Sequence, residues 1–547
     1  MLTMRQRLFL SATALMAWST TFACTNFIVA KGASVDGSVM CTYSADDYGM
    51  FQSLNFMPAA DYADGEMRQI YDGDTHAYHG AIPEAAHTYS VMGNINQFQV
   101  TIGETTFGGR EEMVDSTGII DYGSLMDIAL QRSTTAREAI SVMTSLAEKY
   151  GYNSEGETFT ICDPDEAWIM EMMGCGAGSK SVVWVALRIP DNAICAHANQ
   201  SRIRHFNMAD TANVRCSANV VSYARSMGWY DGDDNDFSFC DAYAPADFSG
   251  RRHCEARVWA FFNHFADMSP YIDYAEGKVE GAEPMPLWIV PDSLLGVGDL
   301  ERCMRDHFEG TPFALDSDIG GGIWDMPYRP TPLSFEVDGK KCFNERPTST
   351  QQSGFVYVAQ MRSWLPDEIG GVLWFANDDS NMVPFTPVYC CGTRAPLCYA
   401  TPGADGVTFN PDNAFWVCNW VSNMVYPRYS LMFESLRQVR DSLDNFYLST
   451  QTALEQRAQE LYNSDPSVAR DFLEQYSCDM AQDMLTQWKQ LAIYLIVKYN
   501  DMTVKPEENG VFLRDENGMP QRVARPGYTE RFARELIKQT GDKFLVP

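Results

Sequence analysis

The chain has 547 residues, of which 45% are hydrophobic and 12% aromatic, so it can bury a large core and is long enough for more than one domain. Its formal net charge of −31 argues against nucleic acid and anionic membrane as partners, because both carry negative charge themselves.

The N-terminal segment predicts a signal peptide. Met1–Arg7 carries two arginines and no acid, Leu8–Trp18 is mostly apolar, and Ala23 is the small residue that precedes a cleavage site. The apolar run is shorter than the roughly 20 residues that a membrane-spanning helix needs, so we expect no stable membrane insertion. Cleavage after Ala23 would make the protein secreted or periplasmic, with Cys24 as its first residue.

An N-terminal cysteine carries a thiol and a free α-amine on one residue. An α-amine has a pKa of about 7.7–8.0, so part of it is unprotonated at neutral pH and can accept the thiol proton. Two alternatives remain open. In a lipoprotein signal Cys24 would be acylated and anchored, although Thr21 stands where that signal usually has an aliphatic residue. In the other, a signal peptide merely ends beside a cysteine.

The residues after Cys24 predict a β-hairpin. Cys24–Lys31 and Ser38–Tyr43 are rich in β-formers, and Gly32–Gly37 supplies turn residues. In an antiparallel hairpin centred there, facing residues have numbers that sum to about 69, which places Asp46 beside Cys24. The alternative is that Asp46 belongs to a solvated loop.

The other fourteen cysteines are an even number, which suits an oxidising compartment. They cluster only at Cys390, Cys391 and Cys398, where a structural disulfide is favoured over a metal site. The sequence has no HExxH motif, no P-loop and no spaced His/Cys ligand set, so we expect no metal and no cofactor.

Strand and helix patterns alternate along the rest of the chain. Thr135–Tyr150 is an amphipathic helix with Thr135 and Glu138 as a capping pair. Asn207–Gly250 is irregular, and its acidic Asp231–Asp236 run is a surface insertion or, alternatively, a calcium loop. Strands are predicted at Tyr89–Met92, Phe98–Thr105, Thr158–Cys162, Ala167–Met172, Ser181–Ile189 and Ala193–Asn199, and further helices from Arg257 to Phe265 and at Val297–His307.

Beyond Tyr429 the pattern changes to long helical runs at Ser430–Leu448, Thr452–Tyr462 and Pro466–Tyr499. None of them holds a motif for chemistry. We expect a helical extension that packs on the preceding domain or on a second subunit in a homo-oligomer.

A series of motifs runs in order over most of Cys24–Tyr429. The motifs are CTNFIVAKGASVDGSVM from Cys24, YSAD at 43–46, YSVMGNINQFQVTIGETTFGGREE at 89–112, AHANQSRI at 196–203, RVW at 257–259, MRDHFEGT at 304–311 and LPDEIGGVLWFANDD at 365–379. Together they resemble the dipeptidase A family of N-terminal-nucleophile cysteine peptidases, and the match is more specific than any single motif.

The resemblance implies an α+β fold, the four-layer αββα sandwich that this family shares with penicillin V acylase and bile salt hydrolase. The chain would then divide into a signal peptide (1–23), a peptidase domain (24–429) and a mainly helical C-terminal extension (430–547). The implied activity is hydrolysis of the peptide bond of dipeptides by a secreted enzyme.

The resemblance also suggests roles for site residues. Cys24 attacks the carbonyl while its α-amine acts as base, and Asp46 matches the aspartate that orients this amine. The side-chain amide of Asn199 is the first candidate for the oxyanion, with a second donor from the strand end around Thr105. Arg257 is a candidate for a structural or electrostatic role, with Arg251 and Arg252 as alternatives, and a solvent-facing helix surface is the simpler explanation for all three.

One position departs from the family pattern. Many relatives have an arginine three residues before the aspartate, where this chain has Tyr43, and a phenol cannot supply a fixed positive charge. Glu104, together with Asp46 and Asp47, is a candidate for binding the ammonium group of a substrate. We assign no catalytic role to His197 in AHANQ or to His307 in RDHFE, because the α-amine already provides a base.

Two other functions remain as alternatives. An amidase of the penicillin V acylase or bile salt hydrolase type would use the same nucleophile on a different acyl group. A surface lipoprotein would bind peptides or glycans through acidic and aromatic loops without turnover.

Overall fold

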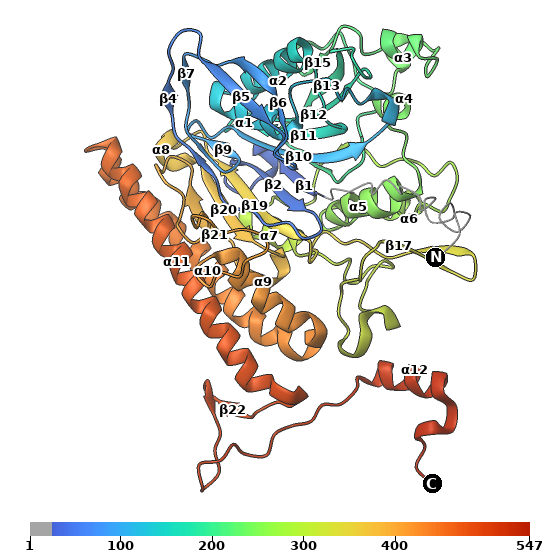
Figure 1. Cartoon of the computed structure of the whole chain (residues 1–547), viewed down its shortest axis with the longest axis vertical. Coiled ribbons are helices and arrows are strands. Elements are labelled where there is room, and N and C mark those ends of the chain that lie inside the picture. Colours follow the sequence, from blue (N-terminus) through green and yellow to red (C-terminus); the bar gives the residue numbers. More distant parts are fainter. Residues whose placement is uncertain (1–23) are drawn as a thin grey trace, which may run out of the picture.

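The computed structural model describes residues 24–547. The predicted signal peptide and its cleavage site lie outside the described residues. Within them the protein is a mixed α+β structure, with two large antiparallel sheets and a helical C-terminal region (Figure 1).

The first large sheet has seven strands and contains the predicted hairpin. Ile28 faces Cys41 and Thr25 faces Ser44, so the facing numbers sum to 69 as predicted. Asp46, the last residue of the second hairpin strand, is therefore brought beside Cys24. In sheet order the strands are β16 (Trp288–Ile289), β14 (Ile194–His197), β1 (Asn26–Val29), β2 (Val39–Asp46), β19 (Ser353–Met361), β20 (Val372–Asn377) and β21 (Thr386–Tyr389).

The second large sheet has eight strands. It confirms the predicted strands on either side of the turn at 163–165. In sheet order the strands are β15 (Val214–Cys216), β13 (Val182–Arg188), β12 (Ala167–Gly174), β11 (Gly156–Cys162), β10 (Thr101–Gly108), β9 (Ile95–Asn96), β8 (Val91–Met92) and β3 (Phe56–Met57).

The prediction of a strand beginning at Phe98 is wrong at its start. The Asn96 side-chain oxygen accepts hydrogen bonds from the backbone amides of Phe98 (2.9 Å) and Val100 (3.0 Å). These bonds curl the chain into an Asx-type turn. As a result β10 begins only at Thr101.

The two large sheets pack against each other. Strands β1 and β2 of the first sheet contact β10 and β11 of the second. Gly103 on β10 allows this approach, because a Cβ atom there would lie 3.0 Å from the Asn26 side-chain nitrogen and 3.1 Å from the Tyr43 Cβ. The close approach brings β10 to the start of the hairpin.

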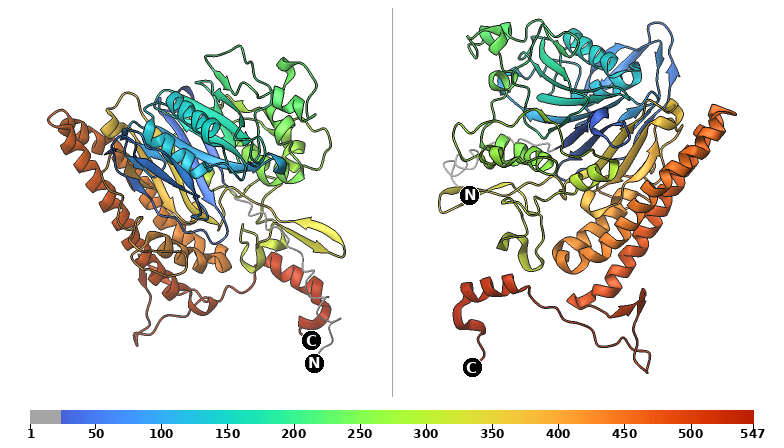
Figure 2. Two further views of the ribbon diagram at one scale, coloured as in Figure 1. Left: turned by 45° about the horizontal axis from the view of Figure 1, so that its top comes forward. Right: turned by 180° about the vertical axis from the view of Figure 1, so that it is seen from behind.

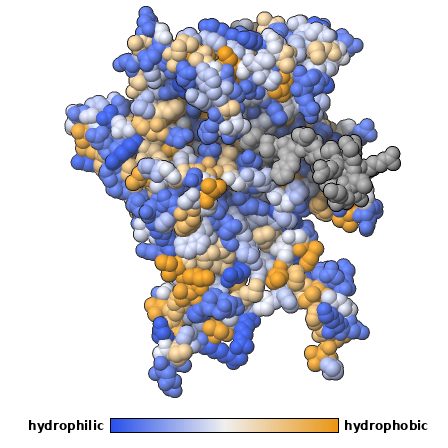
Figure 3. Space-filling model, viewed as in Figure 1, coloured by the Kyte–Doolittle hydropathy of each residue, from blue (hydrophilic) through white to orange (hydrophobic). Residues whose placement is uncertain are grey.

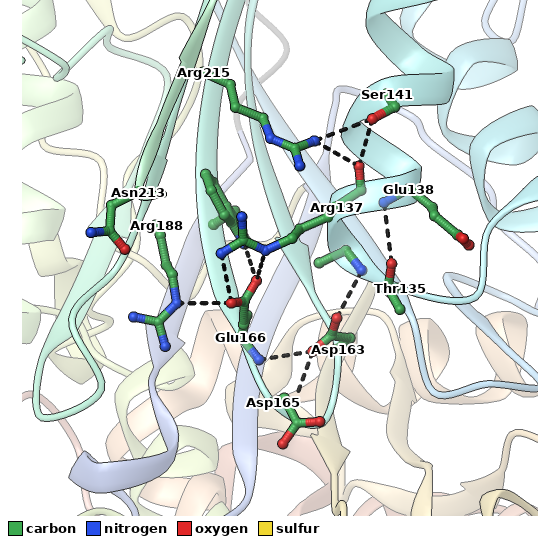
Figure 4. Close-up of polar contacts among 12 residues, drawn as sticks. Thr135, Arg137, Glu138, Ser141, Asp163, Asp165, Glu166, Arg188, Asn213 and Arg215 are labelled. Carbon is green, nitrogen blue, oxygen red and sulfur yellow. Dashed lines mark hydrogen bonds and ion pairs between the residues drawn. The ribbon is translucent and has the colours of Figure 1, made fainter. Parts of the chain in front are cut away.

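Helices cover the outer side of each sheet (Figures 1 and 2). Helices α1 (Tyr122–Arg132) and α2 (Ala136–Tyr150) pack on the eight-stranded sheet, whereas α5 (Ala256–Asn263), α7 (Val297–Met304) and α9 (Ala414–Val425) pack on the seven-stranded one. Thr135 caps α2 by accepting from the Glu138 amide, as predicted, and Asp163 ties the helix to the β11–β12 turn through the Ala136 amide (Figure 4).

The C-terminal helices form an antiparallel pair beside β21 (Figure 2). Helix α11 (Pro466–Tyr499) matches the prediction, but α10 runs unbroken over Tyr429–Tyr462. The predicted break after Leu448 is absent: Ser449 and Thr450 lie within the helix, where their hydroxyls donate to the Phe446 carbonyl.

The remaining elements are short. They are β4 (Ala60–Asp61), β5 (Met67–Tyr71), β6 (Tyr78–Pro83), β7 (His87–Thr88), α3 (Ser222–Ser226), α4 (Phe239–Tyr243), α6 (Ile272–Glu276), β17 (Ser334–Val337), β18 (Lys340–Phe343), α8 (Asp367–Gly370), β22 (Glu507–Glu508), β23 (Val511–Phe512) and α12 (Glu530–Thr540). The acidic run at 231–236 lies exposed between α3 and α4.

The predicted disulfide is not formed. All fifteen cysteines are free thiols, and the sulfur atoms of Cys390 and Cys391 lie 3.9 Å apart, well beyond the roughly 2.05 Å of a disulfide bond. Residues 24–547 also contain no helix that is long and apolar enough to cross a membrane. The face shown in Figure 3 mixes polar and apolar residues, and several apolar residues gather toward its lower end, where Figure 1 shows the C-terminal segment.

Candidate active site

Cys24 lies just before β1 and is almost fully buried in the full-length chain. Its thiol donates a weak hydrogen bond to Glu104 Oε1 at 3.5 Å. Burial raises the pKa of this thiol well above its usual value, and the neighbouring Glu104 and Asp46 carboxylates raise it further. The thiol is therefore held in its protonated form.

Asp46 is buried beside Cys24 rather than lying in a solvated loop. Its carboxylate accepts hydrogen bonds from Ser353 (2.6 Å) and Ser44 (3.0 Å), and it forms an ion pair with Arg346 at 3.0 Å. Burial raises the pKa of Asp46, and the Arg346 charge opposes that rise. The carboxylate is thus fixed in position from three sides.

Arg257 is also buried, so the explanation as a solvent-facing residue is wrong for it. It extends from α5 and donates to the backbone carbonyl of Cys24 at 2.6 Å and to the Thr25 hydroxyl at 2.6 Å. Burial and the nearby Arg346 lower the pKa of Arg257 to about 9. Its guanidinium therefore anchors the residue that carries the thiol.

The two alternative arginines lie elsewhere. Arg252 is also buried, so the solvent-facing explanation is wrong for it too; it pairs with Glu345 and stacks on Phe313. Arg251 is partly exposed and donates to the Val279 carbonyl. Arg257 is accordingly the arginine of this helix that contacts Cys24.

Asn199 lies on the other side of Arg257. Its side-chain oxygen accepts from Arg257 at 2.9 Å, and its side-chain nitrogen donates to the Thr106 carbonyl at 2.9 Å. Its backbone has a φ of 61°, a left-handed conformation that asparagine tolerates better than most residues. Asn199 thus links the arginine to the end of β10.

The hydroxyl of Thr105 is hydrogen-bonded to a histidine instead of to Cys24, Arg257 or Asn199. The hydroxyl is 2.7 Å from Nδ1 of His197, whose Nε2 is 2.7 Å from the Thr160 hydroxyl. Burial holds the pKa of His197 well below its usual value, so the ring is neutral. His197 is satisfied by hydrogen bonds, as expected, and His307 bonds to Glu309 away from Cys24.

Tyr43, which stands where many relatives have an arginine, contacts the carboxyl group of Glu104. Its hydroxyl donates to Glu104 Oε1 at 2.6 Å. Glu157, on the neighbouring strand, lies on the same face of the sheet as Glu104, and its Oε1 accepts from the Thr106 hydroxyl at 2.8 Å. Burial raises the pKa of both glutamic acids.

Sequence reasoning missed Arg346 and Glu157. Arg346 lies in the irregular segment before β19 and belongs to no motif, so the sequence held no signal for it. Glu157 is the one charged residue in the strand sequence GETFTIC, which was a weak signal. No group of three or more His, Cys, Asp or Glu side chains that could hold a metal occurs in residues 24–547.

Cysteine, carboxylate, arginine and amide side chains from separate elements thus meet at one point, as in a cysteine-type hydrolase. The model of Peptidase family C69 matches residues 23–442, and the chain belongs to that family.

Curated relatives are similar over most of the chain. A "Probable dipeptidase" of Salmonella dublin is 25% identical over 69% of this chain and 83% of its own length. A "Probable dipeptidase B" of Streptococcus pyogenes serotype M1 is 22% identical over 88% of this chain and 95% of its own. The "Dipeptidase A" of Lactobacillus helveticus is 23% identical over 72% and 80%, respectively.

Proposed function

We propose that this protein is a secreted cysteine dipeptidase whose nucleophile is Cys24, exposed as the first residue by cleavage after Ala23. The observation that carries the proposal is the placement of Cys24: its thiol contacts Glu104, its carbonyl is bound by Arg257, and the hairpin register sets Asp46 beside it. The names of the relatives support dipeptides as substrates.

The fold is consistent with the proposal. Two packed antiparallel sheets with helices on their outer sides are what an αββα N-terminal-nucleophile sandwich requires. In this assignment residues 24–429 form the peptidase domain and residues 430–547 the helical extension.

The full-length chain is latent in this proposal. The nitrogen of Cys24 is part of the peptide bond to Ala23, so it cannot act as a base, and the thiol has a raised pKa. Cleavage creates the α-amine next to the thiol. An amine with a pKa near neutrality can then remove the proton that the surrounding carboxylates would otherwise keep on sulfur.

In the proposed reaction the Cys24 sulfur attacks the peptide carbonyl while the α-amine takes the thiol proton and passes it to the leaving amine. Water then cleaves the thioester with the same amine as base. Asp46 orients the amine and Arg257 fixes the cysteine backbone. Asn199 is the proposed oxyanion donor, which requires its side-chain nitrogen to turn from the Thr106 carbonyl to the substrate.

The first test is the intact mass of the secreted protein together with its activity on a dipeptide panel, with penicillin V and conjugated bile acids as the comparison substrates. A chain that begins with an unmodified Cys24 and hydrolyses dipeptides supports the proposal. A diacylglyceryl adduct, or an active enzyme with its leader still attached, refutes it.

The second test replaces Cys24. Cys24→Ala should abolish turnover, whereas Cys24→Ser should keep a trace, because a hydroxyl is a weaker nucleophile than a thiol. Cys41→Ala is a matched control, since Cys41 is equally buried on the adjacent strand and is not part of the mechanism. Turnover by Cys24→Ala comparable to that of the control would remove the mechanism.

A further inference from the structure

Glu104 and Glu157 form a buried carboxyl pair next to the thiol. In the β10–β11 register Glu157 faces Thr106, two residues from Glu104, so both glutamates lie on the same face of the sheet. Each is only 1% exposed. Burial and the Glu104 charge raise the pKa of Glu157, which favours a single negative charge on the pair.

This negative charge has no basic partner within residues 24–547. Two other buried glutamates form ion pairs with arginine: Glu255 lies 2.8 Å from Arg202 and Glu455 lies 2.6 Å from Arg362. Neither Glu104 nor Glu157 has such a partner, and Oε2 of each lacks a hydrogen-bond donor. Buried acceptors without donors are costly, and a ligand that supplies the donor is one reason to retain them.

The surroundings reinforce the demand for a positive charge. Asp74 bonds to the Tyr122 hydroxyl at 2.9 Å, and its charge raises the pKa of Glu104. The arginines of the site contact the Cys24 carbonyl and Asp46. A ligand for the carboxyl pair should therefore be a cation that donates hydrogen bonds.

We propose that the Glu104–Glu157 pair is the binding site for the α-ammonium group of the substrate's first residue. The inference rests on the proposed dipeptidase function and specifies its substrate. In an amino acid the nitrogen lies about 2.5 Å from the carbonyl carbon, by standard N–Cα and Cα–C bond lengths. A carbonyl in position for attack by sulfur is about 3–3.5 Å from it.

These lengths match the site. Glu104 Oε1 is 3.5 Å from the Cys24 sulfur, so an ammonium bound to the pair places its own residue's carbonyl within reach of the nucleophile. The single charge of the ammonium also balances the single charge of the pair. The enzyme should consequently require a free amino terminus and cut after the first residue.

The experiment compares Ala-Ala with propionyl-alanine, which has the same acyl skeleton without the amino group. A hydrogen bond to a charged group contributes about 1.5–3 kcal/mol, so kcat/KM of the mature enzyme should be roughly 10- to 150-fold higher for Ala-Ala. In Glu157→Gln this preference should collapse, through a higher KM for Ala-Ala and an unchanged kcat/KM for propionyl-alanine.

Glu155→Gln is the control, because Glu155 is an exposed residue that lies just outside β11. It should keep the preference. The proposal is overturned if the mature enzyme does not prefer Ala-Ala, if Glu157→Gln keeps the preference, or if Glu157→Gln slows both substrates equally, as a proton-transfer or purely structural role would require.

A binding measurement separates this inference from the proposed function. In the Cys24→Ala protein, calorimetry should show Ala-Ala binding at least about tenfold more tightly than propionyl-alanine, and Glu157→Gln on that background should remove the difference. Equal binding of the two ligands overturns the ammonium site. Absence of dipeptide turnover by the enzyme with free Cys24, with the binding preference intact, overturns the proposed function alone.

Discussion

The buried ion pair between Asp46 and Arg346 allows a quantitative test of how the site is held together. The two side chains lie 3.0 Å apart and are 0% and 2% exposed. Asp46→Asn and Arg346→Gln each remove one charge while keeping the size of the side chain nearly constant. The double variant removes both charges.

The two single variants should not be equally destabilised. Asp46→Asn removes the carboxylate that pairs with the buried Arg346 guanidinium, and a broken buried pair costs about 3–5 kcal/mol. Arg346→Gln leaves Asp46, whose pKa is already raised by burial and would rise further without Arg346. This carboxyl can take up a proton, which limits the cost to about 1–3 kcal/mol.

The double variant should be less destabilised than the sum of the single variants, by about 2 kcal/mol or more, because neither charge is left alone. The pH dependence of Arg346→Gln follows from the same pKa. A folded-state pKa above the unfolded value means that the folded protein holds the proton more tightly. The free energy of unfolding should therefore fall, relative to wild type, as the pH rises through the pKa of Asp46.

Denaturant unfolding of the mature protein and its three variants at pH 5 and pH 7 measures these energies. The reasoning is refuted if the single-variant energies add to within about 0.5 kcal/mol, or if Arg346→Gln is destabilised more than Asp46→Asn.

Three further predictions concern separate parts of the molecule. Arg257→Lys should lower kcat/KM for dipeptides, measured by steady-state kinetics, by about 10²-fold or more. A single lysine ammonium cannot make both of the hydrogen bonds that the Arg257 guanidinium donates to the Cys24 and Ala198 carbonyls. Gly103→Ala should cost about 1–3 kcal/mol in denaturant unfolding, since its Cβ would press on the facing sheet. Asp378 is fully buried, and burial raises its pKa from 3.8 to about 7. Between pH 4 and pH 7 the free energy of unfolding of the wild type should therefore fall by about 4 kcal/mol, and that of Asp378→Asn should not. Parallel pH profiles of the two proteins in denaturant unfolding would contradict this.

The parts of the site that follow from local pattern could be predicted from the sequence. The hairpin register follows from two β-rich runs around one turn, and it places Asp46 correctly because both strands are close in sequence. The cap of α2 is likewise a local signal, set by Thr135 and Glu138. Such features need only a few neighbouring residues to be defined.

The parts that depend on distant segments could not be predicted. Arg346 is separated from Asp46 by 300 residues and lies in an irregular segment, so no periodicity points to it. The disulfide prediction was wrong because it rested on closeness in sequence alone. A disulfide needs a specific geometry, and the sulfur atoms of the adjacent Cys390 and Cys391 lie 3.9 Å apart. The family motif around Tyr43 raised the question of the missing positive charge, but the fold was needed to find Arg346 on Asp46.

The distribution of charge around Cys24 bears on how the thiol is activated. Burial and the carboxyl groups of Glu104 and Asp46 raise the pKa of the thiol, and Arg257 binds the carbonyl of Cys24 instead of its sulfur. A thiolate formed before the substrate arrives would be opposed by these charges. The neutral His197 is occupied by two hydroxyl groups and cannot serve as a base for it. In the proposed mechanism the proton therefore leaves sulfur during the attack itself, to the α-amine that cleavage after Ala23 would create on the same residue.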